Sequence, residues 1–210
     1  MASCSSSNVI SYENSFYKMT LNKKTGSLIT IEKKGKNLIN TPGSEGPLFT
    51  IRFRDALQKG EIHEFNALQA QDCKTVVKDE LVTLIYSQFK NVDLKVMVTV
   101  RMSKDSPFMH WNLSVDNNTP YTIDHIDFPN LVVTNDLIAT GGTGRIFWPA
   151  QEGCLIEDVK IRNENGMKFR PIEYPQMGWG GLYPSSVQMQ FMAYYNATGG
   201  LYLAAHDEKC

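Results

Sequence analysis

The sequence predicts an all-β protein with little helix, built from two large packed antiparallel sheets. Apolar and polar residues alternate with a period of two along most of the chain. The segments that alternate recur at the spacing of about 8–12 residues that is typical of sandwiches and barrels. No segment keeps the i, i+3, i+4 apolar spacing of a helix over about three turns. We therefore expect one β-sheet domain with a substantial core.

The first strands are predicted between residues 17 and 54. Tyr17, Met19 and Leu21 alternate with polar residues, and the turn at residues 23–26 leads into a second strand at residues 27–32. A further alternating segment covers residues 47–54. These segments indicate a hairpin followed by a separate strand.

The clearest alternation lies between residues 94 and 117. Every second residue from Leu94 to Met102 is apolar, and the pattern resumes at Met109 after a turn at residues 104–107. This register predicts that Trp111 faces the core, whereas His110 and Asn112 lie on the polar face. A turn at residues 117–120 leads into another strand, which we expect within residues 121–133.

The C-terminal segment combines an aromatic loop with a hairpin. Residues 174–184 are rich in aromatic residues, glycine and proline, and two apolar strands follow, up to the pair His206 and Asp207. Such a loop, next to a rigid hairpin, is suited to holding a flat ligand.

The composition excludes several classes of protein. The 210 residues carry a net charge of −1, so the sequence shows no electrostatic footprint for nucleic acid. No run of about 18 apolar residues predicts a membrane span. The four cysteines form no close pair, and no cofactor motif is present, so we expect neither a metal site nor a cofactor.

The N-terminus suggests a lipid anchor. Cys4 follows small residues and precedes three serines, as at the processing site of a bacterial lipoprotein, although the charged and apolar parts of a signal peptide are missing. We interpret residues 1–15 as a Ser-rich tether with Cys4 as its lipidated residue; the alternative is a chance match. Residues 16–210 then form the β domain, with a candidate truncation at its C-terminal end.

Few residues have a pattern that suggests catalysis. His125 and Asp127 share a strand face at i and i+2, so the carboxylate could orient the imidazole, and His110 is an alternative acid or base. Glycoside cleavage needs two carboxyl groups about 5–10 Å apart, and the spacing of the available acidic residues fixes no such pair.

The loops instead suggest contact with carbohydrate. Aromatic rings next to glycine and proline, with nearby polar groups, suit the mixed apolar and polar surface of a sugar. The candidate residues for this contact are Trp148, Glu152, Trp179, Tyr183, His206 and Asp207. The alternative is that these rings only cover the open end of the sheets as a second core.

Three segments are similar to parts of a known family. The hairpin at residues 21–29, the strands at residues 111–119 with Ile126–Pro129, and the closing strands at residues 189–195 and 199–207 resemble galactose-mutarotase-like β-supersandwich domains. These domains precede the catalytic barrel in some bacterial, Bacteroides-type glycoside hydrolases.

The resemblance implies a large two-sheet supersandwich that is not catalytic by itself. It would associate with carbohydrate and pack on a C-terminal catalytic barrel of the same polypeptide, helping to shape the cleft. It also implies a periplasmic or cell-surface location, with a membrane contact only through the lipid anchor. The alternatives are a free-standing aldose-1-epimerase, with His110 or His125 as its acid, and a structural β-sandwich that binds no sugar.

Overall fold

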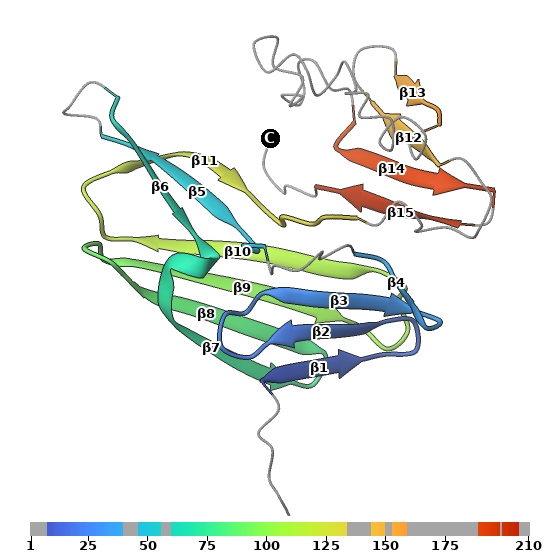
Figure 1. Cartoon of the computed structure of the whole chain (residues 1–210), viewed down its shortest axis with the longest axis horizontal. Helices are drawn as coiled ribbons and strands as arrows, with labels where there is room; N and C mark the ends of the chain where they lie inside the picture. Colours follow the sequence, from blue (N-terminus) through green and yellow to red (C-terminus); the bar gives the residue numbers. More distant parts are fainter. Residues whose placement is uncertain are drawn as a thin grey trace, which may run out of the picture. The chain divides into compact units, whose positions relative to one another are not determined.

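The computed structural model describes residues 8–39, 46–55, 60–133, 144–149, 153–158, 189–197 and 199–205. The chain divides into two compact units, Met1–Thr134 (unit 1) and Asn135–Cys210 (unit 2). The protein is all-β: a short 3₁₀ turn, Ala67–Gln69, is the only helical element among the described residues. The prediction of an all-β protein with little helix is therefore confirmed (Figure 1).

Unit 1 contains three antiparallel sheets. Sheet I has the order β1-β2-β3-β4 and consists of β1 (Val9–Glu13), β2 (Lys18–Asn22), β3 (Leu28–Lys33) and β4 (Lys36–Asn37). Sheet II has the order β11-β5-β6 and consists of β5 (Thr50–Arg54), β6 (Ile62–Asn66) and β11 (Thr122–Asp127). Sheet III has the order β10-β9-β8-β7 and consists of β7 (Ala70–Lys78), β8 (Leu81–Phe89), β9 (Leu94–Met102) and β10 (Met109–Asn117).

Unit 2 contributes one antiparallel sheet among its described residues. Sheet IV has the order β13-β12-β14-β15 and consists of β12 (Arg145–Trp148), β13 (Cys154–Ile156), β14 (Phe191–Asn196) and β15 (Gly199–Ala204). The last two strands form the hairpin that the sequence predicts.

The alternation in the sequence correctly assigns the faces of sheet III. Every second residue of β9, from Leu94 to Met102, is buried, and the residues between them are more exposed. Trp111 packs against the core, whereas His110 and Asn112 are exposed, as predicted. The strand expected within residues 121–133 is shorter than the pattern suggests, because β11 covers only Thr122–Asp127.

The predicted two-sheet supersandwich is not confirmed. The described strands form four sheets of three or four strands each. Sheet II explains the difference: β5 pairs with β6 and with the distant β11, so a separate sheet starts there. Alternation specifies which face of a strand is buried, but it does not specify which strands pair. The domain boundaries at residues 15 and 16 stay a prediction.

One apolar cluster joins the three sheets of unit 1. Its fully buried side chains include Met19 of sheet I, Phe53 of sheet II and Tyr86 of sheet III. The Tyr86 ring meets Phe49, just before β5, edge-on with a centroid separation of 5.0 Å. The Tyr86 hydroxyl donates a hydrogen bond to the carbonyl oxygen of Gly26, in the turn between β2 and β3, at 3.2 Å. Tyr86 thus contacts both of the other sheets.

Gly26 allows this contact for two reasons. Its φ of +66° lies in the left-handed region, which residues other than glycine adopt only at a cost in free energy. A Cβ atom at this position would also clash with the Tyr86 hydroxyl and would lie 2.8 Å from the Cys73 sulfur. The turn therefore approaches β7 and β8 at a distance that only glycine permits.

We expect Gly26→Ala to lower the free energy of unfolding by about 2–4 kcal/mol, because it adds backbone strain to an overpacked contact. Gly35→Ala is the matched control: its φ is +74°, but no atom lies within 4 Å of its Cβ position. The control should lose only about 1–2 kcal/mol, the cost of the backbone conformation. Urea unfolding followed by circular dichroism measures both values, and equal losses would contradict the clash.

The burial of Cys73 predicts how unit 1 responds to alkaline pH. Desolvation, with a smaller contribution from Asp72, raises the pKa of the Cys73 thiol from its ordinary value of 9.0 to about 11. Between these two values the folded chain keeps a proton that the unfolded chain has lost. The stabilisation is therefore complete below pH 9 and is lost as the pH rises towards 11. Desolvation also raises the pKa of Tyr86 above 10.0, which adds to the loss at higher pH.

We expect Cys73→Ala to have a shallower decline of stability between about pH 9 and 10 than the unchanged chain, although its stability at pH 7 is lower because of the lost packing. Urea midpoints at several pH values test this. Parallel pH profiles of the two chains would refute the role of the thiol.

Candidate functional site

The structure brings His125 and Asp127 together. Both lie on β11, an edge strand of sheet II, and His125 Nε2 is 2.8 Å from Asp127 Oδ1. The pairing of β11 with β5 shifts register between Ile123 and His125, so Asp124 lies in an irregular part of the strand. The predicted orientation of the imidazole by the carboxylate at i+2 is thus present in the structure.

An ion pair adjoins this contact on β11. Arg54 Nε of β5 lies 2.5 Å from Asp124 Oδ1. The hydrogen bond from Arg54, together with smaller contributions from Arg52 and His125, lowers the pKa of the Asp124 carboxyl. Asp124 is therefore held as a carboxylate by its cationic neighbours, which makes it a poor proton donor.

The surroundings of His125 do not resemble a catalytic site. The side chains of His125 and Asp127 are 53% and 49% exposed, and all six residues of β11 are exposed. Water therefore competes for the pair and screens its charges, so the pair contributes little to stability or to proton transfer. His110 lies on sheet III, where it pairs across the strands with Arg101. It is exposed and belongs to a different sheet from His125.

His63 has an environment that the sequence does not reveal. It lies on β6 opposite Phe53, on the side of sheet II that faces the core, and its ring stacks on Tyr121 with a centroid separation of 4.1 Å. Its Nε2 atom is buried and has no hydrogen-bond partner among the described residues. The two flanking glutamates suggest an exposed position, but the half-buried ring instead packs as an aromatic group.

A row of aromatic rings crosses one face of sheet IV. Ala193 of β14 pairs with Phe147 of β12 on one side and with Tyr202 of β15 on the other, so these three residues share a face with Phe191. The Phe147 and Phe191 rings stack with centroids 5.6 Å apart, and Phe191 meets Tyr202 at 5.4 Å. We call Phe147, Phe191 and Tyr202 the aromatic row.

The small side chain of Ala193 makes the row compact. Aromatic side chains can reach diagonal neighbours on adjacent strands, and a larger residue between Phe147 and Tyr202 would block this reach. Tyr202 is 50% exposed, so the row ends in a ring that solvent can reach. Sequence reasoning selects Trp148, the neighbour of Phe147, and includes Phe191 and Tyr202 only as part of the closing strands.

Charged groups flank the aromatic row on the same face. Phe147 of β12 pairs with Leu155 of β13. Arg145 lies two residues before Phe147, and Glu157 lies two residues after Leu155, so both point to the face of the aromatic row. Arg145 Nε is 3.3 Å from Glu157 Oε1, with side chains 49% and 55% exposed. Rings, a guanidinium and a carboxylate thus share one face of sheet IV.

Trp148 is the one predicted sugar-contact residue that lies within the described part of the chain. It pairs with Cys154 and follows Phe147 directly, so it lies on the opposite face of sheet IV from the aromatic row. Its indole Nε1 is buried without a hydrogen-bond partner among the described residues. The predictions for Cys4, Glu152, Trp179, Tyr183, His206 and Asp207 fall outside the described residues.

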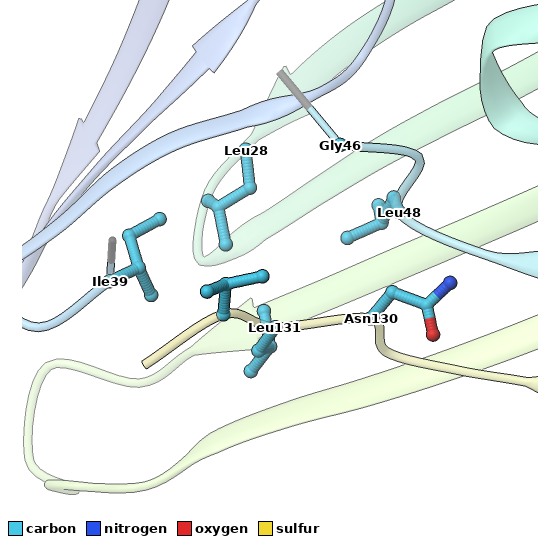
Figure 2. Close-up of a pocket in the computed structure, with 7 residues that line it drawn as sticks. Leu28, Ile39, Gly46, Leu48, Asn130 and Leu131 are labelled. Atoms are coloured by element: carbon cyan, nitrogen blue, oxygen red, sulfur yellow. The ribbon is translucent and has the colours of Figure 1, made fainter. Parts of the chain in front are cut away.

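A small apolar pocket lies in unit 1 (Figure 2). Its lining consists of Leu28, Ile39, Gly46, Leu48, Asn130, Leu131 and Val132. Its cavity volume of about 30 Å³ is enough for one water molecule, whereas sites for small organic ligands measure about 300–1,000 Å³. This pocket is too small to hold a sugar ring.

The described residues carry no group of three or more His, Cys, Asp or Glu side chains placed to hold a metal ion. Within the same residues, no helix has the length and apolarity needed to cross a membrane.

Comparison with known proteins corrects the resemblance. No protein-family model matches the chain, and no curated protein is detectably similar to it. Together with the four separate sheets, this result makes the assignment to the galactose-mutarotase-like supersandwich domains wrong. The quoted segments are a Thr-Gly turn and alternating strands, which antiparallel sheets of many folds share.

Proposed function

We propose that the chain is a non-catalytic carbohydrate-binding module, and that the aromatic row of sheet IV is its contact surface. The observation that carries this proposal is the row of three rings across β12, β14 and β15, which ends in the half-exposed Tyr202. Phe147 and Phe191 are half-buried, so the row presents one exposed ring that continues into a partly covered aromatic surface.

The chemistry of the row suits a sugar. A pyranose ring has apolar C–H groups on its faces, and these gain dispersion and hydrophobic energy against an aromatic surface. Tyr202 adds a phenolic hydroxyl that can donate or accept a hydrogen bond. An amphipathic ring of this kind binds a ligand that is itself partly apolar and partly polar.

The ion pair beside the row supplies the polar part of the surface. The guanidinium of Arg145 offers several N–H donors, and the carboxylate of Glu157 offers acceptors for hydroxyl groups. Both side chains are about half exposed, so they can exchange water for ligand hydroxyls. Rings for the C–H faces and charged groups for the hydroxyls therefore occur together on one sheet face.

The proposal includes no catalytic step. The contact between His125 and Asp127 on β11 is exposed, and neither residue lines the pocket described above, so no observation favours the epimerase alternative. A catalytic barrel in the same polypeptide, a lipid anchor at Cys4 and a periplasmic or cell-surface location stay predictions. The alternative of a structural domain that binds no sugar is an outcome of the experiment below.

We expect the protein to bind at least one neutral polysaccharide from a panel of starch, xylan and glucomannan in affinity gel electrophoresis. Tyr202→Ala should weaken the affinity, measured by calorimetry, by about five- to tenfold, because an aromatic contact is worth about 1–1.5 kcal/mol. Tyr202 is half exposed, so this change leaves the sheet folded.

Phe108→Ala is the matched control, because Phe108 is an aromatic residue of unit 1 that is 55% exposed and lies outside the row. This variant should bind as the unchanged chain does. Absence of binding to the whole panel, or an equal loss in both variants, would show that the aromatic row does not bind sugar.

A further inference from the structure

The outer face of sheet III carries basic residues in a regular array. The buried side chains of β8 and β9, such as Leu84 and Val98, point into the core, so the residues that alternate with them point outward. Strand pairing arranges the outward residues of β7, β8, β9 and β10 in rows, and in the outermost row Asp72 pairs with Ser87 while Asp116 pairs with Lys95. The three adjoining rows contain twelve residues. The rows are Lys74, Ile85, Met97, Ser114; then Val76, Thr83, Thr99, Asn112; then Lys78, Leu81, Arg101, His110. We call these twelve residues the cationic face.

The charge of this face differs from that of the whole chain. Three of its residues, Lys74, Lys78 and Arg101, have basic side chains, and none of the twelve is acidic, whereas Asp72 and Asp116 lie in the adjoining row and the chain has a net charge of −1. The three cations and His110 are exposed. None of the four makes an ion pair with another described residue.

One acidic residue that interacts with Arg101 already accepts a hydrogen bond. Glu80, in the turn between β7 and β8, accepts a hydrogen bond at 3.0 Å from the backbone N–H of Lys104 through Oε1. That hydrogen bond is the main reason for the lowered pKa of Glu80, and the charge of Arg101 contributes less. The basic groups of the face therefore remain available to an external anion.

The remaining eight residues of the face are uncharged: four are polar, and four, Val76, Leu81, Ile85 and Met97, are apolar. Thr83, Thr99, Asn112 and Ser114 offer three hydroxyl groups and one amide between the basic residues. Four strands spaced about 4.8 Å apart and three rows give a surface of about 14 Å by 14 Å. Such a surface accommodates a stretch of several sugar units rather than a single small anion.

We propose that the cationic face binds an acidic polysaccharide, with its basic residues on the anionic groups and its hydroxyl and amide side chains on the sugar hydroxyls. The proposal rests on the proposed function in taking the ligand to be carbohydrate, and it names the ligand class. It assigns a second surface, in unit 1, which is separate in the sequence from the aromatic row of unit 2.

Nucleic acid is a poorer fit to the same charges. Single strands bind to grooves in which bases stack on aromatic side chains, and the twelve residues include no Phe, Tyr or Trp. A duplex carries one phosphate per about 1.7 Å, and three separated cations match only a few of these phosphates. The face instead suits a polymer with a lower charge density and many hydroxyl groups.

The test uses polygalacturonate as the probe and the variant Lys74→Gln/Lys78→Gln/Arg101→Gln. We expect the unchanged chain to bind polygalacturonate with an affinity that falls as salt rises from about 50 to 200 mM. The triple variant should bind at least about tenfold more weakly at the lower salt concentration, and its affinity should depend less on salt.

The matched control is Lys23→Gln/Lys24→Gln/Lys90→Gln, which removes the same net charge from exposed turns outside the face. It should bind polygalacturonate within about twofold of the unchanged chain. All the replaced side chains are exposed, and circular dichroism confirms that each variant is folded.

Equal binding by the two triple variants, or tighter binding of oligo-dT than of polygalacturonate, would overturn the inference.

The outcomes also separate the two proposals. If only Tyr202→Ala impairs binding to neutral polysaccharides and the cationic-face variant binds polygalacturonate normally, the cationic face is refuted and the aromatic row stands. If no neutral polysaccharide binds but the cationic-face variant loses polygalacturonate, the aromatic row is refuted and the cationic face stands.

Discussion

Tyr86 is the side chain on which the arrangement of unit 1 depends. It is fully buried on β8, its ring meets Phe49 next to sheet II, and its hydroxyl reaches the Gly26 carbonyl in sheet I. Burying a polar hydroxyl is costly unless it is hydrogen-bonded, so this bond specifies where the β2–β3 turn must lie. The same packing determines which face of sheet III points outward, and therefore which residues a ligand can reach.

Much of this arrangement follows from alternation in the sequence. Alternation correctly predicts the strands around Val98 and Leu113, the inward position of Trp111 and the closing hairpin. It does so because burial of one sheet face imposes a period of two. The partners of each strand cannot be read in this way. The pairing of β5 with β11 joins segments about 70 residues apart, and no local pattern specifies such a contact.

The candidate sites show the same division. The contact of His125 with Asp127 is local, so spacing predicts it, whereas its exposure depends on the position of β11 at the edge of sheet II. The aromatic row needs the register of three strands, including β12 and β14 from separate parts of the chain. Composition draws attention to Trp148, but strand pairing places the ring of its neighbour Phe147 beside Phe191.

The cationic face shows that a net charge is an average over surfaces. A chain with a total charge of −1 is expected to prefer an anion exchanger near neutral pH. A matrix, however, interacts with the face that approaches it, and the three rows of the cationic face contain three basic side chains, with Asp72 and Asp116 only in the adjoining row. The cationic face can therefore approach a negatively charged resin although the chain as a whole is slightly acidic. Retention on a column of either sign is then a property of one face of the molecule.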